Sequence, residues 1–156
     1  MGKIIRKEWF RGDKNLTSLY IPDTYTIIEE RAFEGCINLE EVHLNESIID
    51  IQDFAFKDTG LKDIHIPDSV KAIGIGVFKG CRNLESIRMP KEVICLSKHA
   101  LLGCSNLKRL ILPQNLMEVE ELIGHIGQLN ALDIYAKKDS LTHESLIKAE
   151  IKCIFY

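Results

Sequence analysis

The sequence lacks the features that would mark a membrane-spanning or nucleic-acid-binding protein. It contains no run of 18 apolar residues, and no basic stretch followed by an apolar one near its start, so it predicts neither a transmembrane helix nor a signal peptide. Neither sign of charge dominates, because 20 Lys and Arg residues are balanced by 23 Asp and Glu residues. The net charge of -3 gives no electrostatic reason to expect a nucleic-acid or anionic-membrane partner.

The motifs of common catalytic and cofactor sites are missing as well. The chain has no Gly-x-Ser-x-Gly, no Walker loop, no Gly-x-Gly-x-x-Gly and no histidine pair at zinc-protease spacing. Its five cysteines include no Cys-x-x-Cys and no Cys/His cluster at zinc spacing. The leading interpretation is therefore a protein that is not an enzyme and that has no cofactor and no metal site.

What the sequence does contain is a repeat of 22 or 23 residues. Three successive slots hold Leu, Ile, Val or Met in every copy, and the slot that follows them holds proline in four copies and asparagine in one. All four prolines of the chain fall in this slot. A period of this length is typical of stacked repeats. The five copies are residues 15–37, 38–59, 60–82, 83–105 and 106–127.

Each repeat predicts one short strand followed by buried apolar residues. The first part alternates apolar and polar residues as a half-buried strand does, and proline ends the strand because it has no backbone N–H to donate. One repeat cannot bury its apolar side alone, so neighbouring strands are expected to pair in parallel about 4.8 Å apart. The sequence predicts an α/β repeat solenoid dominated by a parallel β-sheet.

The pattern LxxIxIPxxVxxIGxxAFxxC, best seen in residues 61–81, resembles the BspA-type (Treponema-type) leucine-rich repeat. This resemblance implies a curved leucine-rich-repeat array with a C-terminal helix/strand cap. It also implies a bacterial, non-enzymatic protein-interaction module, of a kind often found in surface proteins involved in adhesion. The expected location is the cytoplasm if the chain is complete, and the cell surface or the exterior if it is a fragment.

The two ends of the repeat array differ. Residues 1–14 match the second half of a repeat, residues 15–127 hold the five repeats, and residues 128–156 hold a last strand and the cap, all in one domain, 1–156. Asp139 or Ser140 is an acceptable N-cap for a terminal helix. The first strand is left with an unpaired edge and little apolar cover beyond Trp9 and Phe10, so a homodimer through the N-terminal end is expected.

Cysteine recurs in one slot of the repeat, at Cys36, Cys81 and Cys104. This placement favours small buried residues over ligands or disulfides.

Outward-facing strand positions should line the concave face of the solenoid, where a protein or surface ligand is expected to bind. One row holds Tyr20, His43, His65, Arg88, Ile111 and Asp133, and the row two residues earlier holds Ser18, Glu41, Asp63, Ser86, Arg109 and Ala131. The candidate binding residues are Tyr20, Glu41, His43, Asp63, His65, Arg88, Arg109 and Asp133.

Two alternatives to a binding module stay open. His43, Asp63 and His65 fall on adjacent predicted strands, where they could serve a small metal-assisted hydrolase. The chain could also be a purely structural spacer.

Overall fold

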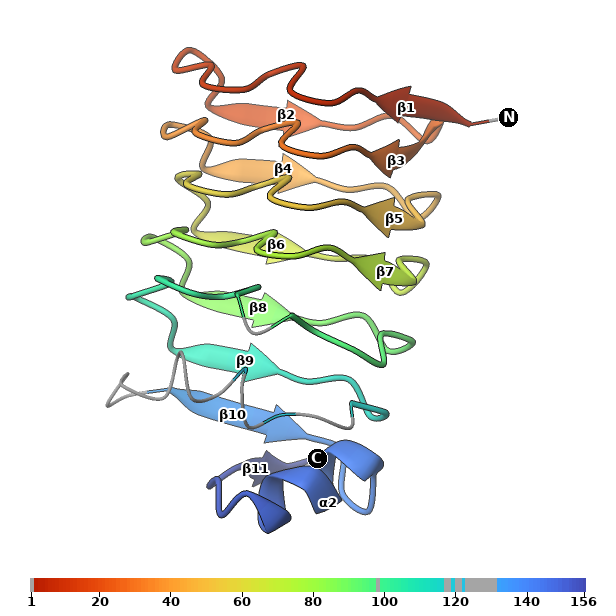
Figure 1. The fold of residues 1–156 in the computed structure, drawn as a ribbon, viewed down its shortest axis with the longest axis vertical. Helices are drawn as coiled ribbons and strands as arrows, with labels where there is room; N and C mark the ends of the chain where they lie inside the picture. The colour runs from red at the N-terminus through yellow and green to blue at the C-terminus, as the bar shows by residue number, and fades with distance from the viewer. Residues whose placement is uncertain (1, 98, 117–118, 120–121, 123–131) are drawn as a thin grey trace.

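The repeats form turns stacked along the long axis of the molecule, with the two chain termini at opposite ends (Figure 1). This computed structural model describes residues 2–97, 99–116, 119, 122 and 132–156. The first residues of the predicted last strand, 128–131, lie outside the described residues.

One short strand per turn builds the principal row of strands. Neighbouring strands pair in parallel where they join a common sheet, and residues one repeat apart lie side by side, as Ser18 and Glu41 do. In the three-residue strands the central residue points inward and its neighbours point outward; Val42 is 5% exposed, for example. The predicted parallel-sheet solenoid is confirmed. The strands are β2 (Ser18–Tyr20), β4 (Glu41–His43), β6 (Asp63–His65), β8 (Ser86–Arg88), β9 (Arg109–Ile111) and β10 (Asp133–Ala136).

The row of strands divides into two sheets between β4 and β6. Strands β2 and β4 form one sheet, and β6, β8, β9, β10 and β11 (Ile154–Phe155) form the other. The repeat before the division, residues 38–59, is one residue shorter than its predecessor, and Gly60 occupies the slot that asparagine holds elsewhere. A Cβ atom on Gly60 would lie 2.4 Å from the carbonyl oxygen of Ile37. Glycine therefore lets the shortened turn pass close to the turn before it.

A second parallel sheet, which the sequence analysis did not predict, runs along the stack. Ile5 pairs with Ile28, Ile28 with Ile51, and Ile51 with Ile73, each one repeat apart. These positions look like simple apolar slots in the sequence. Stacking the turns at strand spacing brings their extended segments within hydrogen-bonding reach of one another. The strands are β1 (Lys3–Ile5), β3 (Tyr25–Ile28), β5 (Asp50–Ile51) and β7 (Ala72–Ile73).

Stacked phenylalanine rings fill the centre of the core. Phe10, Phe33, Phe56 and Phe78 contribute one ring per turn, with centroids 5.2, 5.2 and 5.8 Å apart along the stack and neighbouring planes within 4° of parallel. Phe33, Phe56 and Phe78 are fully buried. Because each ring contacts the rings of its neighbours, the stack links the stability of successive turns.

The repeated cysteines lie beside this stack and are buried, as predicted. Cys36 Sγ donates a hydrogen bond to the Phe10 carbonyl at 2.9 Å, and Cys104 Sγ donates one to the Phe78 carbonyl at 3.2 Å. Each thiol thus ties one turn to the preceding one. Burial raises the pKa of the Cys81 thiol to about 11, and it also raises the pKa of Cys36 and Cys104.

This burial predicts a graded reactivity of the five thiols. With a disulfide reagent at pH 7, we expect exposed Cys95 to react first and half-buried Cys153 more slowly. Cys36, Cys81 and Cys104 should react only when the protein unfolds. The absorbance of the released chromophore, followed over time in buffer and in denaturant, measures how many thiols react and how fast. Cys95→Ser should remove only the fast phase. Rapid labelling of Cys81 in the folded protein would contradict the packing described.

The C-terminal cap consists of α2 (Leu141–Lys148) and β11, which pairs in parallel with β10. Ser140 is the N-cap, and its hydroxyl accepts a hydrogen bond from the His143 amide at 3.2 Å. Buried Thr142 donates to the Pro113 carbonyl and accepts from the Leu116 amide at 2.8 Å, which fixes the helix against the last proline slot. The cap continues the sheet as well as covering the core.

Candidate functional site

The outward side chains of β2, β4, β6, β8, β9 and β10 form a continuous surface, here called the strand face. All eight candidate residues lie on these strands. The strand pairing sorts the outward positions into two rows, which differ at the last strand from the rows expected. The first row holds Ser18, Glu41, Asp63, Ser86, Arg109 and Asp133, and the second holds Tyr20, His43, His65, Arg88, Ile111 and Tyr135.

The placement of Asp133 beside Ile111 was wrong. Asp133 pairs with Arg109, and Tyr135 pairs with Ile111. The repeat length of 22 or 23 residues does not hold here, because 24 residues separate Arg109 from its partner on β10. The row of Arg109 therefore ends in the carboxylate of Asp133, and the row of Arg88 ends in the aromatic ring of Tyr135. The expected partner position, Ala131, lies outside the described residues.

The N-terminal half of the strand face carries histidine, tyrosine and carboxylates. His43 Nε2 lies 2.9 Å from Glu41 Oε1, and the His43 ring is 6.5 Å from the Tyr20 ring. His43 and His65 lie on opposite sides of the division between β4 and β6. Among the described residues, no three His, Cys, Asp or Glu side chains gather into a group that could hold a metal. The metal-assisted hydrolase alternative therefore gains no support from the geometry.

The charge next to the proline slot changes sign along the stack. The residue after this slot is Asp23, Glu46 and Asp68 in the first three repeats, then Lys91 and Gln114 in the next two. Arg88 and Arg109 lie on strands of the same later turns. The first turns are therefore acidic on and beside the strand face. On the later turns Arg88, Lys91 and Arg109 outnumber Asp133, the one carboxylate on strands β8 to β10.

A cavity of about 720 Å³ opens over the basic half of the strand face. Arg88, Arg109, Ile111 and Tyr135 reach it from the strands. The other lining residues were not predicted, because they come from the segments after the strands and from the cap; they are Met89, Lys91, Leu112, Pro113, Gln114, Lys137, Phe155 and Tyr156. The cavity, here called the C-terminal cavity, combines four cations with aromatic and aliphatic side chains.

Asp68 holds two of these cations in place. Its carboxylate accepts hydrogen bonds from Arg88 Nη2 at 3.1 and 3.2 Å and from the Lys91 amide at 3.1 Å, and Lys91 Nζ lies 2.9 Å away. Burial raises the pKa of the Asp68 carboxyl, but the hydrogen bonds from Lys91 and Arg88 outweigh it and lower the pKa to about 2. Asp68 is thus ionised at neutral pH, and it positions Arg88 and Lys91 at the edge of the cavity.

Asp68→Asn is expected to lower the free energy of unfolding by at most about 1 kcal/mol at pH 7, since the carboxylate is about a third exposed and screened by water. A carboxyl whose pKa is lower in the folded state stabilises the protein above its unfolded pKa, near 4, and stops doing so as pH falls through about 2. The difference between parent and variant should therefore shrink from pH 4 to pH 2 in denaturant titrations. A constant difference over this range would contradict the assignment, and Asp23→Asn, an exposed residue of the same slot, is the control.

The remaining two cations of the C-terminal cavity are exposed. The Arg109 guanidinium lies over the Tyr135 ring, 4.7 Å from its centroid, and Lys137 Nζ donates a hydrogen bond to Gln114 Oε1 at 3.2 Å. Stacking on tyrosine orients the planar guanidinium and leaves its donor edges accessible.

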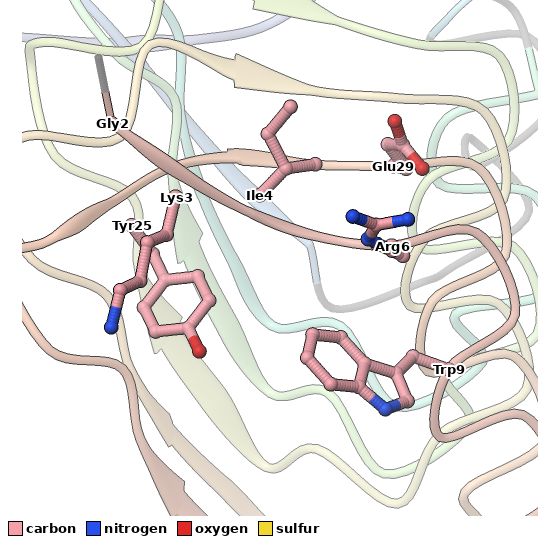
Figure 2. A pocket seen from close by; sticks show the side chains of 7 residues that line it. All are labelled: Gly2, Lys3, Ile4, Arg6, Trp9, Tyr25 and Glu29. Atoms are coloured by element: carbon pink, nitrogen blue, oxygen red, sulfur yellow. The ribbon is translucent and has the colours of Figure 1, made fainter.

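A second cavity, of about 570 Å³, lies beside β1 at the N-terminal end. Figure 2 shows Lys3 and Tyr25 on one side of it and Arg6 and Trp9 on the other. Trp9 is 54% exposed and stacks on Phe10, with ring centroids 5.8 Å apart. The expected apolar cover of the first turn is therefore present but incomplete.

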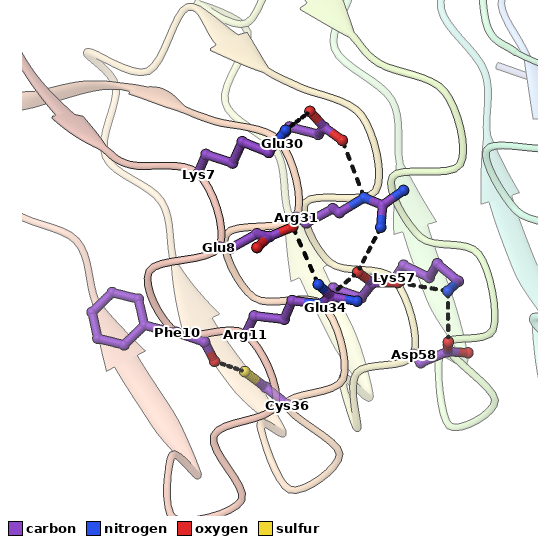
Figure 3. Close-up of polar contacts among 10 residues, drawn as sticks. All are labelled: Lys7, Glu8, Phe10, Arg11, Glu30, Arg31, Glu34, Cys36, Lys57 and Asp58. Atoms are coloured by element: carbon purple, nitrogen blue, oxygen red, sulfur yellow. Dashed lines mark hydrogen bonds and ion pairs between the residues drawn. The ribbon is translucent and has the colours of Figure 1, made fainter.

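Away from the strand face, a charged cluster links the first three turns. Figure 3 shows the Glu34 carboxylate among three cations: Lys57 Nζ at 2.6 Å, Arg11 Nε at 3.1 Å and Arg31 Nη1 at 3.7 Å. Burial raises the pKa of Glu34, but these contacts, led by the Lys57 hydrogen bond, hold it below its ordinary value. Arg11, Glu34 and Lys57 are spaced by one repeat, so the cluster favours the observed register of the turns.

The family model of the BspA type leucine rich repeat region matches residues 3–123 with six copies. The chain belongs to this family. The BspA-type resemblance expected from the sequence is thereby confirmed, and it covers all the strand face up to β9. No curated protein matches the chain.

Three solved structures are similar to this BspA-type chain. A leucine rich repeat protein of T. pallidum has a TM-score of 0.75 and 21% identity over 97% of this chain and 78% of its own. The pneumococcal vaccine antigen PcpA has a TM-score of 0.78 and 20% identity, over 96% of this chain and 37% of its own. A leucine-rich repeat protein from Bacteroides ovatus has a TM-score of 0.55 and 26% identity, over 86% and 37%. These likenesses show the fold, and a bacterial origin fits them.

Proposed function

We propose that this chain is a non-enzymatic protein-interaction module that binds a protein partner through its strand face. The observation that carries the proposal is the pair of outward rows, whose side chains are chemically varied and dispensable for the core. Glu41, Asp63 and Arg109 are exposed, and the buried residue between each pair of outward positions holds the strand in place. A rigid sheet that presents such side chains loses little conformational entropy on binding.

The family supports the same reading, because leucine-rich repeats form extended binding surfaces from successive strands. No group of residues described by the structure forms a metal site, and the absence of nucleophile motifs in the sequence points the same way. No helix among the described residues is long and apolar enough to cross a membrane.

Site-specific photo-cross-linking tests the proposal. A benzophenone amino acid is placed at His65 or Ile111 on the strand face, and at exposed Ile75 beyond β7 as the control. Incubation with extract of the source cells should give a discrete cross-linked protein from the two face positions and not from Ile75. Excess unlabelled parent protein should compete for it.

Cross-linking from Ile75 alone would move the binding surface to another side of the molecule. No cross-link from any position would favour the structural-spacer alternative. The homodimer through the N-terminal end stays a prediction, and sedimentation of the chain at tens of micromolar tests it: a monomer would show that residues 2–14 cover the first turn well enough.

A further inference from the structure

The C-terminal cavity offers a ligand both positive charge and apolar surface. Arg88 and Lys91 already share Asp68, whereas Arg109 and Lys137 contact a tyrosine ring and an amide. Among the described lining residues there is no carboxylate side chain. A ligand that brings carboxylates to this cavity would therefore meet donors that are oriented and still accessible.

Apolar side chains lie among these cations. Ile111 is half-buried and lies between Arg88 and Tyr135 in the second row, and Phe155 and Tyr156 of the cap are 48% and 64% exposed. Arginine and aromatic residues such as tyrosine are enriched among the residues that carry most of the binding energy in protein interfaces. A small inorganic anion would use the charge of the cavity and leave this apolar surface in water.

We propose that the C-terminal cavity binds an acidic, extended segment of the partner that carries both carboxylate and apolar side chains. This inference rests on the proposed function and specifies the chemistry of the partner. Charged and apolar side chains both line this cavity, so carboxylates of the segment can pair with Arg109 and Lys137 while its apolar side chains lie against Ile111 and Phe155. Six extended residues span about 20 Å, enough to cross β8, β9, β10 and β11, which cover about 14 Å at strand spacing.

The acidic half of the strand face strengthens this choice. Glu41 and Asp63 lie on this face toward its N-terminal end, and Asp23 and Glu46 follow the proline slots of the first two repeats, so all four repel an acidic segment there. The segment is therefore steered toward the last turns, and the same repulsion selects against binding in the wrong register.

The test uses a fluorescent hexapeptide of the composition Glu-Leu-Glu-Phe-Glu-Leu, blocked at both ends, and the full chain. Fluorescence anisotropy should show saturable binding that weakens with salt. Arg109→Glu and Lys137→Glu should each weaken it by about tenfold or more, because each removes a charge-assisted hydrogen bond and adds a repulsive charge. Arg82→Glu, which makes the same charge change at an exposed residue outside the cavity, should leave binding within about twofold. Circular dichroism melting confirms that each variant is folded, and exposed Lys137 gives a second test should Arg109→Glu unfold.

Three further probes identify the binding chemistry. A Glu-Ser peptide of equal charge should bind at least about tenfold more weakly than the Glu-Leu-Glu-Phe peptide, since it lacks apolar side chains. Inorganic phosphate at millimolar concentration should not displace the peptide at constant ionic strength. If phosphate displaces it, or if a heparin-derived hexasaccharide binds more tightly and is lost in the same variants, the site is for simple anions or acidic glycans and the proposal is overturned.

The experiments distinguish failure of the acidic-segment proposal from failure of the proposed function. If the peptide does not bind while His65 and Ile111 still cross-link a partner, the acidic segment is wrong and the strand face remains the binding surface. If the peptide binds equally to the parent and to both cavity variants, the cavity is not its site.

Discussion

Phe56→Ala is expected to lower the free energy of unfolding by about 3–5 kcal/mol, the range for removing a buried aromatic ring. Phe56 is fully buried, and it stacks between Phe33 at 5.2 Å and Phe78 at 5.8 Å. Removing its ring leaves a cavity in the middle of the stack and weakens the contacts of two neighbouring turns at once. Because turns are stabilised by their neighbours, the whole array should unfold in one transition at lower denaturant concentration.

Phe10→Ala is the matched control for this measurement. Phe10 belongs to the same stack but is only half-buried, at the end of the stack, with Trp9 on its outer side. Its loss should cost clearly less than that of Phe56 in urea titrations followed by circular dichroism. A loss below about 1 kcal/mol for Phe56→Ala would show that the ring is not a core element.

Gly60→Asn should destabilise the protein by about 2–3 kcal/mol, although it restores the residue that four other repeats have in this slot. The physical reason is the shorter repeat before it. A Cβ at residue 60 would lie 2.4 Å from the Ile37 carbonyl oxygen and 3.4 Å from the Leu39 carbonyl oxygen, and both atoms belong to backbone that cannot move aside cheaply.

A length-corrected variant provides the control for this second result. Inserting one isoleucine between Thr59 and Gly60, together with Gly60→Asn, gives residues 38–59 the length and sequence pattern of the first repeat. This variant should recover most of the lost free energy of unfolding. A neutral or stabilising effect of Gly60→Asn alone would mean that the consensus, rather than the close approach of the turns, decides this position.

The outward positions of the strand face could be predicted from the repeat, whereas the C-terminal cavity could not. Periodicity assigned Arg88 and Arg109 to outward positions, because each strand alternates buried and exposed residues in a fixed phase. It missed Lys137, Phe155 and Tyr156, which line the same cavity from the last strand's end and the cap. Their positions follow from how the cap folds back onto β10, which no repeat describes.

The sequence by itself determined the fold, the strands of the principal row and the residues of the core. Each of these depends on a local pattern that recurs along the chain: apolar spacing and a small residue in the cysteine slot, with a proline after the strand in four of the five repeats. Proline and side-chain alternation act within a few residues, so they can be read without knowing the neighbours.

Only the tertiary structure decided the second sheet, the division between β4 and β6, the register of Asp133 and the C-terminal cavity. Each of these depends on how one turn meets the next. Extended segments such as β3 and β5 become strands because a neighbouring turn offers hydrogen-bond partners. The turn that is one residue short brings residue 60 close to the backbone of the preceding turn, and glycine fits there because it has no Cβ. Asp133 lies beside Arg109 because the chain between them takes 24 residues instead of 22 or 23. Contacts between turns set these features, and they form only once the solenoid is stacked.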